Sequence, residues 1–255
     1  VGLLGLAVLM QGCCSDCRGT AGASPREAVA TRVSGSIVLD GKLDEPDWTK
    51  ARAYELMPGG ETYDKLPEAM KATVGRDLRE KGECRLLWDK DNLYVAASFV
   101  DSELYAYGKE DHQHHYAMGD VFEVFIKPVD ESYYWELYVT PLGHKTAFFF
   151  PGRGARIGVA MALEPIDIKV AAHVDGSVNN WHDRDRVWTA EMAIPRKELE
   201  KYGAKFGPGT KWLIFLARYN YSRYLPVTEL SSYPAQAQVP NFHIHEEYAS
   251  LKLAE

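Results

Sequence analysis

The chain has 255 residues, of which 46 % are hydrophobic and 12 % aromatic, and its formal net charge is −7. This length is enough to bury one sizeable core, and all-β domains often reach this size undivided. The composition argues against a nucleic-acid partner, because phosphate binding needs a concentrated surplus of Lys and Arg that the sequence shows nowhere.

The first thirteen residues have the pattern of an export signal. An apolar run from Val1 to Met10 is followed by Gln11, Gly12 and Cys13. The run is too short to span a bilayer and is typical of the apolar region of a secretory signal. A small residue before a cysteine resembles a bacterial lipobox, so we predict a signal peptide and lipobox over 1–13, with Cys13 lipidated. A disulfide or metal cluster among the three N-terminal cysteines is the alternative.

Residues 14–35 are mostly small and polar and show little apolar periodicity. Such a composition favours a flexible tether between a lipid and a folded domain. We therefore expect a protein of the bacterial cell envelope, periplasmic or surface-exposed, that contacts the membrane through its lipid anchor only. Cys84 stands alone in a strand-like segment, where a cysteine is usually a small buried hydrophobe.

From residue 36 onward, apolar residues alternate with other residues at period two, and Gly, Pro, Asn and Asp interrupt the runs. The candidate strands are 69–75, 84–89, 92–101, 120–127, 135–140, 145–150, 166–174, 187–194, 211–221 and 248–253. Short helices are predicted at 45–51 and at 195–202, the second beginning with Pro195 and ending near Gly203. About ten strands without long crossover helices predict one all-β domain over 36–255, an antiparallel β-sandwich or jelly roll.

Several local patterns occur in order along this domain. They are I-V-L-D-G-K-L-D-E-P-D-W at Ile37–Trp48, R-L-L-W-D-K-D-N-L-Y-V-A-A-S-F-V-D at Arg85–Asp101, G-D-V-F-E-V-F-I at Gly119–Ile126 with the aromatic strand 133–140, V-W-T-A-E-M-A-I-P-R-K-E-L at Val187–Leu199, and N-F-H-I-H-E-E-Y-A-S-L-K-L at Asn241–Leu253. Together they resemble the family 9 carbohydrate-binding modules and their relatives among the DOMON-like sandwiches. The resemblance implies carbohydrate binding without cleavage.

Modules of this family hold one or two sugar rings between two aromatic side chains. Such pairing suits a pyranose, whose C–H faces pack on aromatic rings while its hydroxyls need donors and acceptors. We call each of these two aromatic side chains a platform. The resemblance places one platform at Tyr116, with Ala117 as the other possible alignment, and the opposite platform at Phe242, with Tyr233 nearby. Both platforms are Trp in the family pattern, so this chain departs from it twice.

The resemblance also assigns the polar contacts. Glu123 matches the family's acidic residue, whereas its Arg and Asn on the next strand match Tyr138 and Thr140. Arg218 and Asn220 lie on the corresponding later strand, Arg218 where a Gln is expected. Strand alternation predicts that these side chains point away from the apolar rows, as a binding face requires. Packing of the aromatic residues in the core, and a structural Glu123–Arg218 ion pair, are the alternatives.

Two other functions stay open. A glycoside hydrolase needs two carboxyl groups that flank the scissile bond, and Glu123 and Glu136 share the non-core parity on adjacent predicted strands. A haem or metal protein is the second alternative, since histidines chelate transition metals and DOMON-like relatives bind haem through Met and His. The candidate metal and haem ligands are His112, His114, His115, His243, His245 and Met118.

Related modules also carry structural calcium, for which Asp40, Asp44, Asp89 and Asp91 in predicted turns are candidates, although Asp in a turn commonly serves the backbone. Among the tryptophans, Trp181 lies in a polar loop and is predicted to be exposed, and we expect most of the others in the core. The sequence thus predicts a non-catalytic, monomeric carbohydrate-binding protein that supports polysaccharide breakdown at the cell surface.

Overall fold

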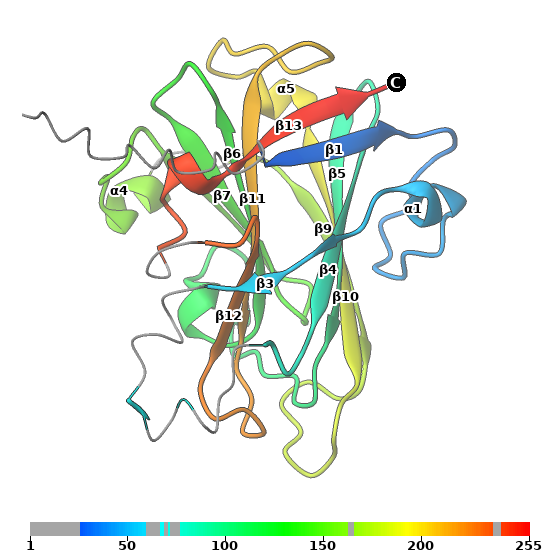
Figure 1. The fold of residues 1–255 in the computed structure, drawn as a ribbon, viewed down its shortest axis with the longest axis vertical. Helices are drawn as coiled ribbons and strands as arrows, with labels where there is room; N and C mark the ends of the chain where they lie inside the picture. Colours follow the sequence, from blue (N-terminus) through cyan, green and yellow to red (C-terminus); the bar gives the residue numbers. More distant parts are fainter. Residues whose placement is uncertain (1–25, 60–66, 69–70, 72–76, 163–165, 237–240) are drawn as a thin grey trace, which may run out of the picture.

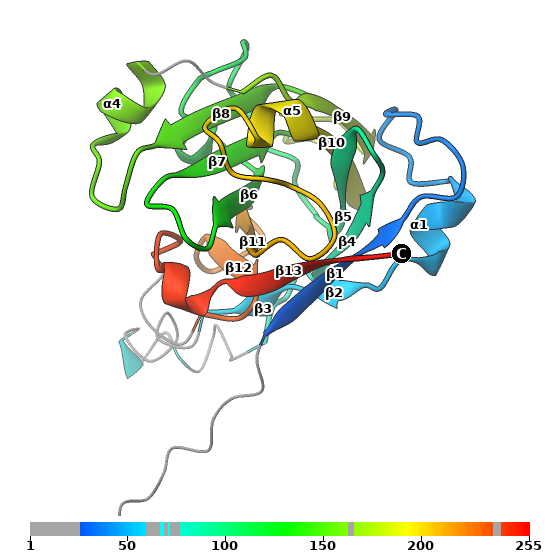
Figure 2. The same cartoon turned by 90° about the horizontal axis from the view of Figure 1, so that it is seen from above.

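The structure is a computed structural model that describes residues 26–59, 67–68, 71, 77–162, 166–236 and 241–255. Its strands join into one thirteen-stranded sheet that curls around a central core, so that two halves face each other (Figures 1 and 2). Along the main path, the strand order is β8-β7-β6-β11-β13-β1-β4-β5-β10-β9. The predicted all-β sandwich is confirmed, and it closes almost into a barrel.

One half of the sheet contains β6 (Val121–Pro128), β7 (Tyr134–Val139), β8 (Lys145–Phe150) and β11 (Trp212–Asn220). The other half contains β4 (Gly82–Trp88), β5 (Asn92–Val100), β9 (Lys169–Asp175) and β10 (Val187–Pro195). The halves are linked by β13 (Ala249–Ala254) and β1 (Glu27–Arg32), while the short strands β2 (Tyr54–Glu55), β3 (Met57–Pro58) and β12 (Glu229–Tyr233) pair at their margins.

Strand β1 corrects the sequence prediction in two ways. Residues 27–32 lie within the predicted tether, yet they pair with β13 and β4, and both pairings are parallel. All the other pairings among the described strands are antiparallel, as predicted. The strand buries only Ala28 and Ala30 completely, and two alanines give too weak an apolar signal to be separated from the small residues before them.

The central core lies between the two halves and is formed by the inward rows of their strands. It includes Phe99, Phe122, Leu216 and the lone Cys84, which is fully buried as predicted. Five tryptophans are buried, also as predicted: Trp48, Trp88, Trp135, Trp188 and Trp212. The sixth, Trp181, is 67 % exposed and confirms the loop prediction.

A second apolar cluster lies on the outer side of the half formed by β6, β7, β8 and β11. Phe125, Tyr134, Phe148 and Phe215 belong to it. Helix α4 (Ile157–Ala162) and the 3-10 turn η2 (His245–Glu247) before β13 lie outside this half of the sheet (Figure 2). These strands are therefore apolar on both faces, which decides where several polar side chains point.

The predicted helices are confirmed in shorter form. Helix α1 spans Pro46–Lys50 and α5 spans Arg196–Leu199, and a further 3-10 turn, η1, spans His115–Ala117. The predicted strand at 69–75 lies outside the described residues except at Lys71, as do Cys13 and the rest of the N-terminal signal. Among the described helices, none has the length and apolar character needed to cross a membrane.

Candidate functional site

A pocket of about 250 Å³ opens on the outer face of β6, β7 and β11. Its lining residues come from these strands and from the segments at η1, α4 and before η2: Tyr116, Glu123, Phe125, Glu136, Tyr138, Ile157, Tyr219, Asn241, Phe242 and His243. Four predicted site residues, Tyr116, Glu123, Tyr138 and Phe242, are thus brought together in one cavity.

Strand alternation brings two glutamates into this pocket. On β6, Phe122 and Val124 enter the central core, so Glu123 between them points outward. On β7 the same alternation places Glu136 and Tyr138 outward, and Glu123 lies directly opposite Tyr138 in the register. The two carboxyl groups therefore occupy diagonal positions on one face of an antiparallel pair.

Both carboxyl groups are buried and incompletely bonded. Glu123 is 1 % exposed and Glu136 is 4 % exposed. Within the described part of the chain, Glu123 Oε1 and Glu136 Oε2 have no hydrogen-bond partner. A buried acceptor without a partner costs free energy, so these two oxygens are ready to bind the hydroxyls of a ligand.

Burial also changes the charge of this pair. It raises the pKa of Glu136 to about 7, and burial together with the nearby Glu136 raises the pKa of Glu123 well above its usual range. At neutral pH the pair therefore retains a proton, because two carboxylates in one dry site repel each other. The pair can donate a hydrogen bond as well as accept several.

Neighbouring hydroxyl and imidazole groups orient the pair. The Tyr138 hydroxyl donates to Glu136 Oε1. His243 Nε2 lies 3.9 Å from Glu136 Oε2, and a 2.8 Å hydrogen bond joins its Nδ1 to the Tyr134 hydroxyl. Burial, and to a lesser degree Arg153, lowers the pKa of His243, so this imidazole is neutral near pH 7.

Aromatic side chains wall the pocket. Tyr116 lies in η1, is partly exposed, and has its ring centroid 6.1 Å from that of Tyr219. Phe242 is almost buried and contacts Phe125, Phe215 and Tyr219 at 5.4–6.1 Å between centroids. The two predicted platforms therefore both line the cavity, and Phe242 also belongs to the outer core, which was the alternative to a binding role.

Arg218 and Asn220 do not line the pocket. They share the inward row of β11 with Leu216, so the prediction that they point to the binding face is wrong. Arg218 donates to Asp101 Oδ2 at 2.8 Å and Asn220 donates to Glu80 Oε2 at 2.7 Å. Arg218 thus forms a structural ion pair, with Asp101 in place of the Glu123 considered from the sequence.

Tyr233 also lies elsewhere. It pairs with Leu216 on the inward side of β12, its ring is 4.5 Å from that of Tyr54, and its hydroxyl donates to the Glu27 carbonyl. It is held by the strand β1 that the sequence did not predict. Ala117, the alternative to Tyr116, is exposed and does not line the pocket.

Sequence reasoning missed Phe125, Tyr219 and His243 as lining residues and considered Glu136 only for hydrolysis. A signal was available, since Phe125 is two residues from Glu123 and Tyr219 sits on a strand already assigned to the site. Choosing Tyr219 over Arg218 required knowing which of two apolar rows on β11 faces inward.

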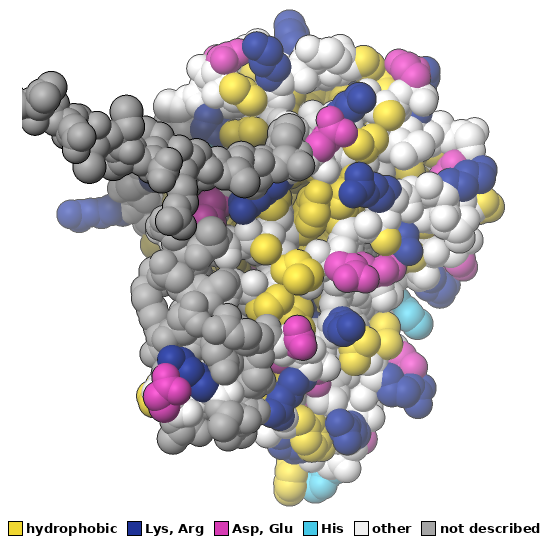
Figure 3. All heavy atoms as spheres, viewed as in Figure 1, with side chains coloured by type: hydrophobic (Ala, Val, Ile, Leu, Met, Phe, Trp, Pro, Cys, Tyr) yellow, Lys and Arg dark blue, Asp and Glu magenta, His cyan; other side chains and the backbone are white. Residues whose placement is uncertain are grey.

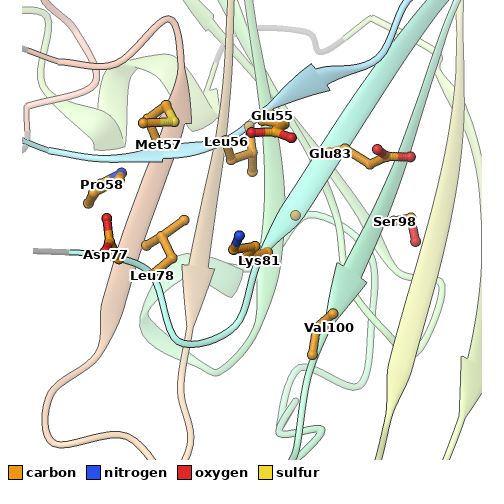
Figure 4. A pocket seen from close by; sticks show the side chains of 11 residues that line it. Glu55, Leu56, Met57, Pro58, Asp77, Leu78, Lys81, Glu83, Ser98 and Val100 are labelled. Atoms are coloured by element: carbon orange, nitrogen blue, oxygen red, sulfur yellow. The ribbon is translucent and has the colours of Figure 1, made fainter. Parts of the chain in front are cut away.

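A larger pocket of about 520 Å³ lies between β2–β3 and β4–β5 (Figure 4). On the face seen in Figure 3, hydrophobic side chains reach the surface among acidic and basic ones, and the lining of the larger pocket is mixed in the same way. This pocket combines the apolar Leu56, Met57 and Leu78 with the charged Lys81 and Glu83, and its lining contains no aromatic residue. It therefore lacks a platform on which a sugar ring could pack.

Two of the four predicted calcium ligands, Asp40 and Asp89, already have other partners. Asp40 binds the Lys42 ammonium at 2.9 Å, and Asp89 accepts the backbone N–H groups of Asp91 and Asn92, both at 2.7 Å. These two carboxylates serve their turns. Nowhere in the described ranges do three or more His, Cys, Asp or Glu residues gather as metal ligands.

The predicted histidine ligands also have structural surroundings. His115 uses both ring nitrogens, Nδ1 with the Thr146 hydroxyl at 2.8 Å and Nε2 with the Glu110 carbonyl at 3.1 Å. The ring of His245 lies 4.4 Å from that of Tyr134, on the side of the sheet where His243 lines the pocket. As arranged, His115 has no nitrogen left for a metal or a haem.

Comparisons with known proteins show what this fold is similar to. A Bacteroides uniformis protein for which carbohydrate binding is proposed has a similar structure, with a TM-score of 0.65 at 12 % identity over 90 % of this chain and 100 % of that one. A family 9 carbohydrate-binding module from Caldicellulosiruptor kristjanssonii in complex with cellotriose matches with a TM-score of 0.53 at 14 % identity, over 89 % and 93 % of the two chains. Its complex with glucose gives 0.51 at 13 % identity, over 89 % and 95 %.

Because these identities are low, the structural matches establish a shared fold and nothing further. No curated protein matches the chain. The model of the carbohydrate family 9 binding domain-like family matches residues 39–197, which is more than half of the sequence. The chain belongs to the carbohydrate family 9 binding domain-like family.

Proposed function

We propose that the chain binds carbohydrate in the pocket on β6, β7 and β11, with one sugar ring against Tyr116 and Phe242 and its hydroxyls on Glu123 and Glu136. The observation that carries the proposal is the pair of buried glutamates whose unpartnered oxygens lie in an aromatic-walled pocket. A pyranose presents C–H faces to such walls and hydroxyls to such acceptors.

The size of the pocket supports a small ligand. Its 250 Å³ lies below the roughly 300–1,000 Å³ typical of drug-sized ligand sites, so one sugar ring suits it better than a longer segment. In Caldicellulosiruptor kristjanssonii, a module of the same family is known in complex with cellotriose and with glucose. Glucose and β-1,4-glucans are therefore the first ligands to test.

The chain is a non-catalytic module, in keeping with its family. The same two glutamates were the candidates for hydrolysis, and a binding role accounts for both, since the family binds sugars without cleaving them. Incubation with xylan, glucans and aryl glycosides should release no reducing sugar.

Binding can be tested with a glycan array followed by calorimetry on the wild type, Tyr116→Ala and Glu123→Gln. Tyr116 is partly exposed, so its removal should spare the fold, and losing ring packing should weaken binding roughly tenfold. Glu83→Gln is the matched control, because Glu83 lines the larger pocket. Unchanged affinity in both site variants, or loss only in the control, would place the sugar elsewhere.

We further propose that the protein is held at the bacterial cell envelope by lipidation of Cys13 and captures polysaccharide there to support its breakdown. The apolar run before Gly12 and Cys13 and the small, polar residues after them support this proposal. Two acyl chains anchor a protein firmly, whereas one is marginal. Expression of the chain behind an export signal in a bacterial host should place it in the membrane fraction, and Cys13→Ser should release it as a monomer on size exclusion.

A further inference from the structure

We propose that the sugar site extends beyond the pocket along a row of four tyrosines, Tyr219, Tyr221, Tyr105 and Tyr107, so that the protein binds several successive units of one glycan chain. This inference rests on the proposed function of the pocket. It adds the length of the ligand and the direction in which the ligand leaves the pocket.

The tyrosine row begins inside the pocket. Tyr219 lines the cavity, and its ring centroid is 5.4 Å from that of Phe242. Tyr221, two residues further along the chain, lies 6.4 Å from Tyr219 with the ring planes only 14° apart. The row continues from Tyr221 to Tyr105 at 6.5 Å and ends with Tyr107, 4.7 Å from Tyr105.

Exposure increases along the row. Tyr219 and Tyr221 are half-buried, whereas Tyr105 is 37 % and Tyr107 is 55 % exposed. Exposed aromatic side chains that gather in a continuous patch are uncommon on monomers and mark binding surfaces. Tyrosine suits such a surface, because its ring packs on apolar faces while its hydroxyl forms hydrogen bonds at the wet edge.

One buried carboxylate fixes the row. Asp120 is almost completely buried, and its Oδ1 accepts the backbone N–H of Tyr221 at 2.7 Å while its Oδ2 accepts that of Tyr105, also at 2.7 Å. The two segments that carry the row are far apart in sequence, so Asp120 sets the position of one relative to the other. The buried side chain thus holds the backbone beneath the exposed rings.

Two more residues secure the outer end of the row. Asn179 binds both backbone groups of Ala106, between the two exposed tyrosines, at 2.9 Å to its N–H and 2.6 Å to its carbonyl. Gly119 lies against the same segment, where a Cβ would come within 2.1 Å of the Tyr105 carbonyl oxygen. These contacts hold in place the backbone segment that carries the two rings. Such a preorganised surface loses little entropy on binding.

The same glycan chain is the occupant that these observations favour. The row is continuous with the pocket, and the pocket has room for one ring, so the next units of a chain must leave along a neighbouring surface. At the exposed end of the row, Tyr105 and Tyr107 can pack on the C–H groups of further units and bond their hydroxyls. The Tyr221 hydroxyl already donates to the Tyr116 carbonyl at 2.7 Å, which ties the row to the pocket wall. Beside the row, Glu103 is paired with Arg223 at 3.4 Å, so its charge is balanced, which suits a neutral polysaccharide.

The experiment compares glucose, xylose and mannose with their β-1,4-linked hexasaccharides by calorimetry on the intact chain. The test variant is Tyr105→Ala with Tyr107→Ala, and the same pair changed to Phe keeps the rings. Tyr202→Ala is the control, because Tyr202 is similarly exposed and packs on Phe149, away from the row. The wild type should bind a hexasaccharide at least tenfold more tightly than its monosaccharide.

The double alanine variant should lose roughly threefold to tenfold in hexasaccharide affinity with monosaccharide affinity unchanged, while the Phe pair and the control keep both. Equal wild-type affinity for monosaccharide and hexasaccharide would overturn this inference alone, as would an alanine variant that retains the preference. If the wild type binds none of the six sugars, both the pocket and its extension are wrong for these ligands.

Discussion

Arg218 and Asp101 form an ion pair at 2.8 Å between Nη2 and Oδ2, with both side chains almost fully buried between the halves of the sheet. Arg218 Nη1 also donates to the carbonyls of Glu80 and Val100, and the guanidinium lies 4.8 Å from the Phe99 ring centroid. The arginine that the sequence suggested as a sugar ligand therefore holds the core together at one end.

Replacing Arg218 should accordingly change stability. Arg218→Ala leaves Asp101 buried without its partner, a change that typically costs about 3–5 kcal/mol. The free energy of unfolding from urea titration measures this loss. Arg223→Ala is the matched control, because Arg223 pairs with Glu103 at the surface, where an ion pair contributes about 0–1 kcal/mol. Wild-type stability in Arg218→Ala would contradict the structural role.

The buried Glu123–Glu136 pair should make the fold less stable as pH rises. Burial raises the folded-state pKa of Glu136 from 4.5 to about 7. Between these values the folded chain binds more protons than the unfolded chain, so the free energy of unfolding falls as pH increases. The contribution is fully present below about pH 4.5 and is lost as pH passes through about 7.

Glu136→Gln removes this titration, so the stability of the wild type relative to the variant should fall between pH 4.5 and 8. Glu136 alone should contribute a change on the order of 3 kcal/mol, because its pKa rises from 4.5 to about 7 on folding. Burial also raises the pKa of Asp101, but Asp101 is present in both proteins, so its own titration cancels. The difference between the proteins reports the Glu123–Glu136 pair, because Glu136 also raises the pKa of Glu123. Parallel stability curves for the two proteins would refute the prediction.

Gly41 should not tolerate a side chain. It has φ +82° and a Cβ would lie 2.5 Å from the Ala172 carbonyl carbon. Gly41→Ala should therefore cost more than the roughly 1–2 kcal/mol of a left-handed conformation alone. Gly143 has a similar φ of +77° with open space around it, so Gly143→Ala is the control that measures the conformational cost alone. Equal melting temperatures for the two variants would show that the close approach is relaxed at little cost.

Glu191 should be needed for the turn that contains Gly41. Its Oε1 accepts the Trp48 indole N–H at 2.9 Å, and its Oε2 accepts the backbone N–H of Gly41 at 2.7 Å. Glu191→Ala leaves these buried donors unpaired, at about 1–3 kcal/mol for each. Glu191→Gln keeps one acceptor and should lose less. The denaturant midpoints of the wild type and the two variants measure these losses. Wild-type midpoints in both variants would count against this role.

Much of the fold was readable from the sequence alone. Period-two alternation identified β4 to β11 and β13, because most of these strands bury a row of apolar residues and a turn residue ends each run. Strand β9 is only partly buried, and Val170, Ala172 and Val174 pack against the core from the edge of the sheet. The burial of five tryptophans and the exposure of Trp181 followed from the same pattern. The placement of Tyr116, Glu123 and Phe242 in one cavity agrees with the family resemblance, which carries positions that periodicity does not.

The tertiary structure decided which face of each strand is the binding face. Strands β6, β7 and β11 are covered on both sides, inward by the core and outward by the cluster that includes Phe125 and Phe215, so apolar rows occupy both parities. Alternation then separates Arg218 from Tyr219 but cannot tell which of them points outward. That choice depends on the curl of the sheet, which brings Asp101 to Arg218 on the inside and Phe242 to Tyr219 on the outside.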